Sequence, residues 1–165
     1  MDIFKNYQNS LKDYQTEYKS NHWKKFDLRL DLFKNENLKN FRNNGLSDGL
    51  DDRYSLKEQK KIYKDLVDEL GENYVFKYLN DRNVGNSLYC YKYKNKYIDG
   101  GQNFHIKWLN EIEKYLVPNI NISSVCEIGG GYGSFGEKLI KAFNCKYVSI
   151  DLPEANYLAS YYLKE

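Results

Sequence analysis

The feature that most constrains this chain is a cluster of glycines that interrupts an apolar segment. Residues 125–136 read VCEIGGGYGSFG, so a short apolar stretch carrying Glu127 runs into Gly129, Gly130, Gly131 and Gly133. Glycine adopts positive φ angles readily and has no Cβ, so the backbone there can approach a ligand closely. A helix that follows such a turn points unpaired amides at an anionic group. The segment therefore predicts a strand, a turn able to contact a nucleotide-like ligand, and a helix.

A second apolar stretch, at 147–150, ends in Asp151, 18 residues after Gly133. An acid at the end of the neighbouring strand can accept hydrogen bonds from both hydroxyls of a ribose. Pro153 follows closely and suits the first turn of a helix. The C-terminal part therefore predicts a strand at 123–128, a helix at 134–143, a strand at 146–150 and a helix at 153–163.

The first 118 residues predict a mainly helical region. Apolar residues at 4, 7, 11, 14 and 18 recur with helical spacing. Ser55 and Glu58 form a capping-box pattern, so a helix should begin at Ser55, and Gly71 can end it. Further expected elements are a helix at 23–33, a loop at 35–52, a short helix at 74–79, a small hairpin from 87–91 and 96–98, and a helix at 103–116. A domain boundary is therefore predicted between residues 118 and 119, where alternating strands and helices begin.

The charge balance narrows the classes of partner. The formal net charge is +2 and acids and bases are interspersed, so no electrostatic argument supports a nucleic acid or a membrane surface as partner. Neither an export signal nor a membrane-spanning apolar stretch is present, which predicts a soluble, cytoplasmic protein. The three cysteines lack CxxC spacing, and the acidic loop at 48–52 lacks the glycine and glutamate of a calcium loop, so no metal site is predicted.

The glycine cluster matches two known patterns. Gly131-x-Gly133-x-x-Gly136 satisfies the dinucleotide fingerprint and leaves an NAD(P)-binding protein open. Glu127-x-Gly129-x-Gly131-x-Gly133, with an acid ending the next strand, resembles the first two motifs of class I S-adenosylmethionine-dependent methyltransferases. The segments EIGGGYG at 127–133, DLPE at 151–154 and YYL at 161–163 are similar to the bacterial putative sugar O-methyltransferase family. LSDGLDD at 46–52 and NVGN at 83–86 are similar, less specifically, to that family's N-terminal helical region.

This resemblance implies a cofactor, S-adenosyl-L-methionine, and residues that hold it. Gly129, Gly131 and Gly133 would line its methionine and ribose portion, while Glu127 would order the loop and the amino group.

By the same resemblance, Asp151 would bind the ribose hydroxyls and Leu152 would pack on the adenine. Tyr132 has two open interpretations, in which it stacks on the ligand or covers the loop.

The implied fold is α/β, with residues 119–165 as the first half of a Rossmann-like methyltransferase core. The implied reaction is methyl transfer to a sugar or glycan hydroxyl. Catalytic residues stay unassigned, because such enzymes take the acceptor site and the general base mostly from later strands. The chain is therefore expected to be an inactive N-terminal fragment, with apolar surface left exposed at its two parallel strands.

Simpler interpretations stay open for several of these residues. Cys126 is expected to be a small buried hydrophobic residue, and Asp151 could serve only as a helix cap before Pro153. His105 and His22 are expected to be structural. For the whole chain, the alternative outside the enzyme class is a helical interaction module whose glycine loop binds nothing.

Overall fold

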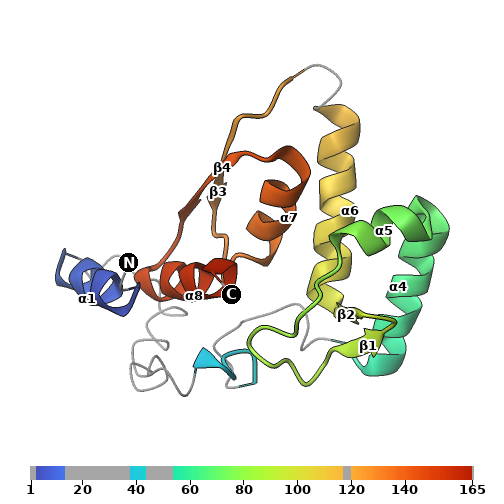
Figure 1. Ribbon diagram of the computed structural model, residues 1–165, viewed down its shortest axis with the longest axis horizontal. Helices are drawn as coiled ribbons and strands as arrows, with labels where there is room; N and C mark the ends of the chain where they lie inside the picture. The colour runs from blue at the N-terminus through green and yellow to red at the C-terminus, as the bar shows by residue number, and fades with distance from the viewer. Residues whose placement is uncertain (1–2, 14–37, 44–53, 117–119, 165) are drawn as a thin grey trace.

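The computed structural model describes residues 3–13, 38–43, 54–116 and 120–164 as a mixed α/β protein (Figure 1). Helices dominate the N-terminal part, and a strand–helix–strand–helix unit follows. The elements are α1 (Ile3–Asp13), α4 (Leu56–Leu70), α5 (Glu72–Tyr78), β1 (Tyr91–Tyr93), β2 (Lys96–Ile98), α6 (Gly100–Tyr115), β3 (Ser124–Ile128), α7 (Ser134–Phe143), β4 (Lys146–Ile150) and α8 (Pro153–Lys164). The mixed α/β class predicted from the sequence is confirmed.

Helix α4 is bounded by the signals that its sequence carries. The Ser55 Oγ accepts a hydrogen bond from the Glu58 amide at 3.3 Å, and the Glu58 carboxylate accepts one from the Ser55 amide at 2.8 Å. Gly71, with φ of 84°, ends the helix. The capping box and the end of this helix are therefore confirmed. Residues 14–18, the end of the first expected helix, lie outside the described residues, as do the expected helix at 23–33 and most of the expected loop at 35–52.

The hairpin and helix α6 differ from the prediction in where they begin. The first strand is β1 at 91–93 instead of 87–91, because the Asn83 side chain pairs with both the amide and the carbonyl of Ser87, each at 3.0 Å, and holds that segment in a turn. Helix α6 begins at Gly100, three residues earlier than predicted, because the Asp99 carboxylate accepts from the Gln102 amide at 2.8 Å and caps it. Helix α5 likewise begins at Glu72, before the predicted residue 74.

The C-terminal part follows the predicted order closely. Strands β3 and β4 pair in parallel, with Ile128 opposite Ile150 at the end of the ladder, and α7 connects them. Both α7 and β4 have the predicted bounds, β3 starts one residue later, and α8 continues to Lys164. Because parallel strands end at the same edge of a sheet, the turn after β3 and the residue after β4 are neighbours.

The two faces of this small sheet are different. Val125 and Tyr147 belong to the apolar cluster that includes helix α7. The alternating residues face the other way, and Ile128 is 82% exposed, with Val148 also exposed. The expected apolar surface at these strands is therefore present. Cys126 is exposed on the same side, so the prediction that it is buried was wrong, because strand alternation turns it away from α7.

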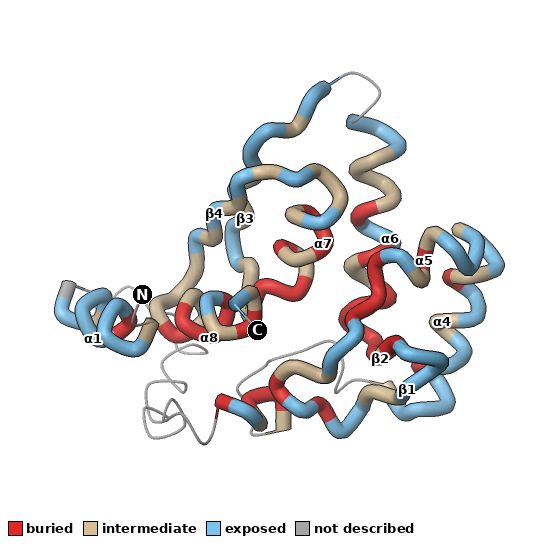
Figure 2. The backbone as a smooth tube through the Cα atoms, viewed as in Figure 1, coloured by how far each residue is buried: buried red, intermediate tan, exposed pale blue. Residues whose placement is uncertain are grey.

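Two apolar clusters hold the described residues together, and both combine residues from before and after residue 119. The first joins Tyr7 of α1 and Phe41 to Tyr157 and Tyr162 of α8. The second joins α4, α5 and α6 to Leu139 of α7. Figure 2 shows buried positions where α7 faces α6 and along α8, and also around β2 and the start of α6. The two predicted parts of the chain therefore share their packing.

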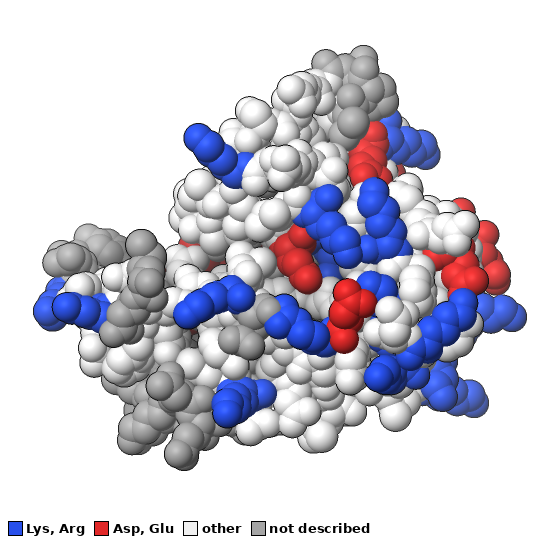
Figure 3. Space-filling view, in the orientation of Figure 1, with Lys and Arg blue, Asp and Glu red and all other residues white. Residues whose placement is uncertain are grey.

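The surface is mixed in charge. Lys94 pairs with Glu72 and Lys107 with Glu69, at 2.8 and 2.9 Å, on exposed positions. On the face drawn in Figure 3, basic and acidic side chains lie beside one another over the helical N-terminal part. Among the described residues, no helix combines the length and the apolar character needed to cross a membrane.

Candidate functional site

The turn between β3 and α7 has an open backbone at two of its glycines. Gly129, Gly131 and Gly133 adopt φ angles of 75°, 57° and 87°, a region that favours glycine. A Cβ built on Gly129 or Gly131 would meet no heavy atom within 4 Å, the chain neighbours aside. These two positions therefore leave room for a ligand to contact the main chain.

Asp151 points toward this turn from the neighbouring strand. Its Oδ2 accepts a hydrogen bond from the Gly131 amide at 2.8 Å, and its Oδ1 accepts one from the Leu152 amide at 2.7 Å. An ionised carboxylate has about four acceptor positions, so about two stay available for a ligand's hydroxyls. Leu152 itself is half-buried immediately after this acid. The parallel register thus places the predicted acid beside the predicted glycine turn.

Glu127 lies beneath the turn, on the side of α7. Its Oε2 accepts a hydrogen bond from the Tyr147 hydroxyl at 2.5 Å and lies 3.2 Å from where a Cβ on Gly130 would be. Burial raises the pKa of the Glu127 carboxyl, and the charge of Asp151 adds to this rise, against the Tyr147 hydrogen bond. This carboxyl therefore supports the turn from below.

Gly130 and Gly136 serve packing against the strands. A Cβ on Gly130 would lie 2.8 Å from the Tyr147 hydroxyl oxygen, and one on Gly136 would lie 2.4 Å from Tyr147 Cζ. Real Cβ atoms do not approach that closely, so a side chain at either position would displace the Tyr147 side chain where the helix and turn meet β4. The glycines of this motif thus divide into an open pair and a close-packed pair.

Tyr132 lies within the turn but packs toward the N-terminal part. Its ring centroid is 5.4 Å from that of Phe41 and 5.2 Å from that of Tyr162, both in edge-to-face geometry. The Arg42 guanidinium lies over the ring, 5.5 Å from its centroid. Of the two open interpretations, these contacts favour the one in which Tyr132 covers the loop.

His105 of α6 meets the first residue of α7. Its Nδ1 lies 3.1 Å from the Oγ of Ser134, and its ring packs against Phe135 and Trp108. Burial lowers the pKa of His105 to about 4, and the nearby cation of Lys138 adds to this effect, so the imidazole is neutral at pH 7. The sequence assigned His105 a structural role, and its contact with Ser134 joins it to the start of α7. His22 lies outside the described residues.

Arg42, whose guanidinium lies over the Tyr132 ring, belongs to a buried ion pair that was not predicted from the sequence. Arg42 contacts the Asp99 carboxylate at 2.8 Å, and both side chains are almost fully buried. Burial acts to raise the pKa of Asp99, but the Arg42 charge and the hydrogen bonds from Gln102 outweigh it and lower this pKa. The pattern of Asp99 three residues before Gln102 was a readable cap signal. Arg42 is 57 residues away in the chain, and no local signal identifies it.

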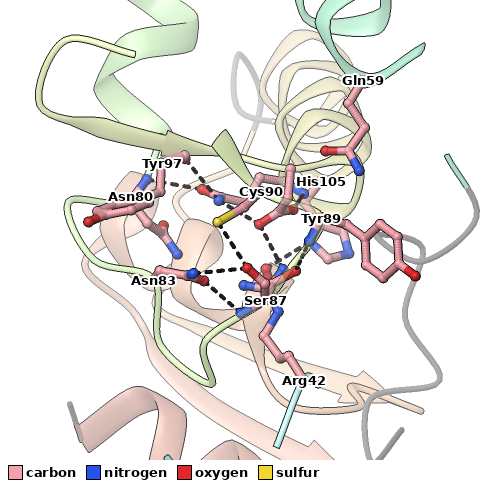
Figure 4. Close-up of polar contacts among 12 residues, drawn as sticks. Arg42, Gln59, Asn80, Asn83, Ser87, Tyr89, Cys90, Tyr97 and His105 are labelled. Atoms are coloured by element: carbon pink, nitrogen blue, oxygen red, sulfur yellow. Dashed lines mark hydrogen bonds and ion pairs between the residues drawn. The ribbon is translucent and has the colours of Figure 1, made fainter. Parts of the chain in front are cut away.

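A second buried polar group joins α7 and α8 to the N-terminal part. The Lys138 ammonium donates to the side chains of Asn80 and Glu137, and Tyr162 donates to Glu137 at 2.7 Å. Burial lowers the pKa of Lys138, partly offset by the Glu137 charge. Figure 4 shows Asn80, Arg42 and His105 converging from separate segments of the chain. The contacts of Asn80 with Lys138 and of His105 with Ser134 connect the two parts of the molecule.

Among the described residues, no group of three or more His, Cys, Asp and Glu side chains could hold a metal ion. The acidic loop at 48–52 lies outside the described residues. Comparisons of the chain with family models, with curated proteins and with solved structures gave no match.

Proposed function

We propose that this chain binds S-adenosyl-L-methionine through the turn at 129–133 and through Asp151, as the cofactor-binding part of an O-methyltransferase that acts on a sugar or glycan hydroxyl. The observation that carries the proposal is the 2.8 Å contact between the Asp151 carboxylate and the Gly131 amide, at a turn whose backbone is open. In this interpretation β3, α7, β4 and α8 are the start of a Rossmann-like core. The choice of a sugar acceptor rests on the sequence resemblance alone.

The described residues fit this cofactor. The remaining acceptor positions of Asp151 suit the two ribose hydroxyls, and open space at Gly129 and Gly131 suits close contact with the cofactor. Leu152 follows Asp151 and provides an apolar side chain for the adenine. When bound, the cofactor supplies a methyl group on a sulfonium, which an acceptor oxygen can attack in line. The chain's own contribution is orientation, since no described residue is assigned as the general base.

A nicotinamide cofactor is the second candidate, and one observation favours it. The third glycine of the dinucleotide fingerprint serves close helix–strand packing, and Gly136 lies against the Tyr147 ring in that way. Both candidates use an acid after the second strand, so the geometry of Asp151 is common to them.

Calorimetric titration of the whole chain with S-adenosylhomocysteine and, separately, with NAD⁺ tests the proposal. We expect binding of S-adenosylhomocysteine only. A preference for NAD⁺ would assign the site to a nicotinamide cofactor. Binding of neither compound to a chain that is folded by circular dichroism would support the helical interaction module instead.

The variant Asp151→Asn tests the carboxylate itself. A charge-assisted hydrogen bond contributes about 1.5–3 kcal/mol, so the variant should lose about tenfold or more in affinity for S-adenosylhomocysteine. Asp68→Asn on the exposed side of α4 is the matched control and should bind like the parent chain. Equal affinity of the Asp151 variant and the control would remove Asp151 from the site.

A further inference from the structure

We infer that Tyr132 is a positioning residue, which fixes the glycine turn for the cofactor through its contacts with the N-terminal part and α8. This inference rests on the proposed function, and it adds a role for the N-terminal part of the chain, which supports the turn. In it, Tyr132 does not touch the cofactor. The turn takes its shape from residues that are distant in sequence.

Glycines flank Tyr132 on both sides in the turn. Gly131 and Gly133 have φ angles of 57° and 87°, and glycine samples many backbone conformations when nothing restrains it. The peptide that joins Gly131 to Tyr132 is planar, so a displacement of Tyr132 reorients the neighbouring backbone. The Gly131 amide, which donates to Asp151, belongs to the preceding peptide. Holding the Tyr132 ring therefore restrains the backbone at the proposed site.

The ring is held by side chains that are themselves fixed. Phe41, fully buried, meets the ring of Tyr132 edge to face. Gly85 approaches Phe41 so closely that a Cβ there would lie 2.4 Å from its ring, and the Gly85 carbonyl accepts from the Arg42 amide at 3.0 Å. The Arg42 side chain, in turn, is paired with buried Asp99. Segment 38–43 is thus held by Gly85 and Asp99 and packs against the turn through Phe41.

Helix α8 holds the other side of the same turn. Tyr162 packs edge to face on the Tyr132 ring. A Cβ on Gly133 would lie 3.3 Å from side-chain atoms of Ala159 and Leu163, so the helix lies directly against the backbone there. Tyr132 therefore lies between segment 38–43 and α8, and residues from both parts of the chain hold its ring.

Four variants of the whole chain test the inference by calorimetry with S-adenosylhomocysteine, at a temperature where circular dichroism shows each one folded. Tyr132→Ala should lose about tenfold or more in affinity, because the turn must then be ordered on binding. Tyr132→Phe keeps the ring and should bind like the parent chain. Phe41→Ala should also lose affinity, although Phe41 lies outside the turn. Tyr157→Ala is the matched control, since Tyr157 is a buried tyrosine of the same apolar cluster that stacks on Tyr7.

Hydrogen exchange at the Gly131 amide, without any ligand, separates this inference from the proposed function. Exchange should accelerate in Tyr132→Ala and Phe41→Ala but not in Tyr157→Ala. If the parent chain binds no S-adenosylhomocysteine, the proposed function fails, and with it any role of Tyr132 toward that cofactor, whatever the exchange shows. If the parent binds and Tyr132→Ala retains its affinity, the positioning role alone is overturned. Loss of affinity in Tyr132→Ala with full affinity in Phe41→Ala would overturn it as well, because Tyr132 would then contact the cofactor directly.

Discussion

At the scale of single residues, the glycines after β3 differ in what lies where a side chain would begin. Gly130 and Gly136 face the Tyr147 side chain at less than 3 Å from an added Cβ, whereas Gly129 and Gly131 face open space. The sequence shows only a cluster of identical residues. The structure divides them into two that allow the chain to pack and two that allow something else to approach.

Two glycine variants should separate these roles. Gly136→Ala overpacks the contact with Tyr147, and such changes cost about 1–3 kcal/mol, so its melting temperature should fall by roughly 2–4 °C per kcal/mol while the folded protein keeps its affinity for S-adenosylhomocysteine. Gly131→Ala places a Cβ in the open space at positive φ, and should lose about tenfold or more in affinity. Calorimetry and thermal denaturation of both variants check this. Loss of affinity in Gly136→Ala, with loss of stability alone in Gly131→Ala, would contradict these two roles.

Single residues also show where prediction from the sequence ends. Asp151 was predicted to end the strand next to the glycine turn, and its carboxylate accepts a hydrogen bond from the Gly131 amide. Cys126 was predicted to be buried from its residue type, yet the strand's alternation exposes it. The ion pair of Arg42 with Asp99 joins distant segments, so no local pattern predicts it. Local sequence signals thus identified the glycine turn, but not the distant residues that pack against it.

At the scale of elements, boundaries were predicted well where capping chemistry is local. The capping box at Ser55 and Gly71, with its positive φ, bound α4 as expected, and Pro153 begins α8. Helix α6 begins earlier than predicted, because the Asp99 cap draws Gly100 and Gly101 into the helix. The first hairpin strand was misplaced because a side-chain turn between Asn83 and Ser87 occupies the predicted residues.

The contact between α6 and α7 should make stability depend on pH. Burial is the largest cause that lowers the pKa of His105 from 6.5 to about 4. The cations of Lys138 and Arg42 act in the same direction, and the carboxylates of Asp99 and Glu137 oppose them. Between pH 6.5 and 4 the unfolded chain therefore binds a proton that the folded chain does not. Stability from this group is present above pH 6.5 and falls with decreasing pH, by at most about 1.4 kcal/mol per pH unit.

Urea denaturation of the parent chain and of His105→Gln between pH 4.5 and 7 measures this effect. The glutamine side chain can still hydrogen-bond to Ser134 but does not titrate. The free energy of unfolding of the variant, relative to the parent, should therefore rise as the pH falls. Parallel profiles across the whole range would show that His105 titrates alike in both states.

At the scale of the whole molecule, the two parts on either side of the predicted boundary at residue 119 share the same apolar clusters. Tyr7 and Phe41 share an apolar cluster with α8, and Leu66 and Ile106 share another with Leu139 of α7. The buried polar contacts from Asn80 to Lys138 and Tyr162 cross the same position. The outer face of β3 and β4, in contrast, carries exposed apolar residues such as Ile128. The strand–helix unit is therefore packed against the N-terminal helices, whereas the outer face of β3 and β4 is left exposed.

This shared packing predicts that the chain unfolds as one cooperative unit. Leu139 of α7 is buried among residues of α4, α5 and α6, so Leu139→Ala should cost about 2–5 kcal/mol. Both tryptophans, Trp23 and Trp108, precede residue 119, and Trp108 packs against Phe135 of α7, so fluorescence follows the N-terminal part together with its contact to α7. Because the second cluster includes both parts, the variant should shift the fluorescence transition in urea and the circular dichroism transition by the same amount. A fluorescence transition that stays at the parent's midpoint, while the circular dichroism signal is lost in two steps, would show that the N-terminal part folds independently of α7.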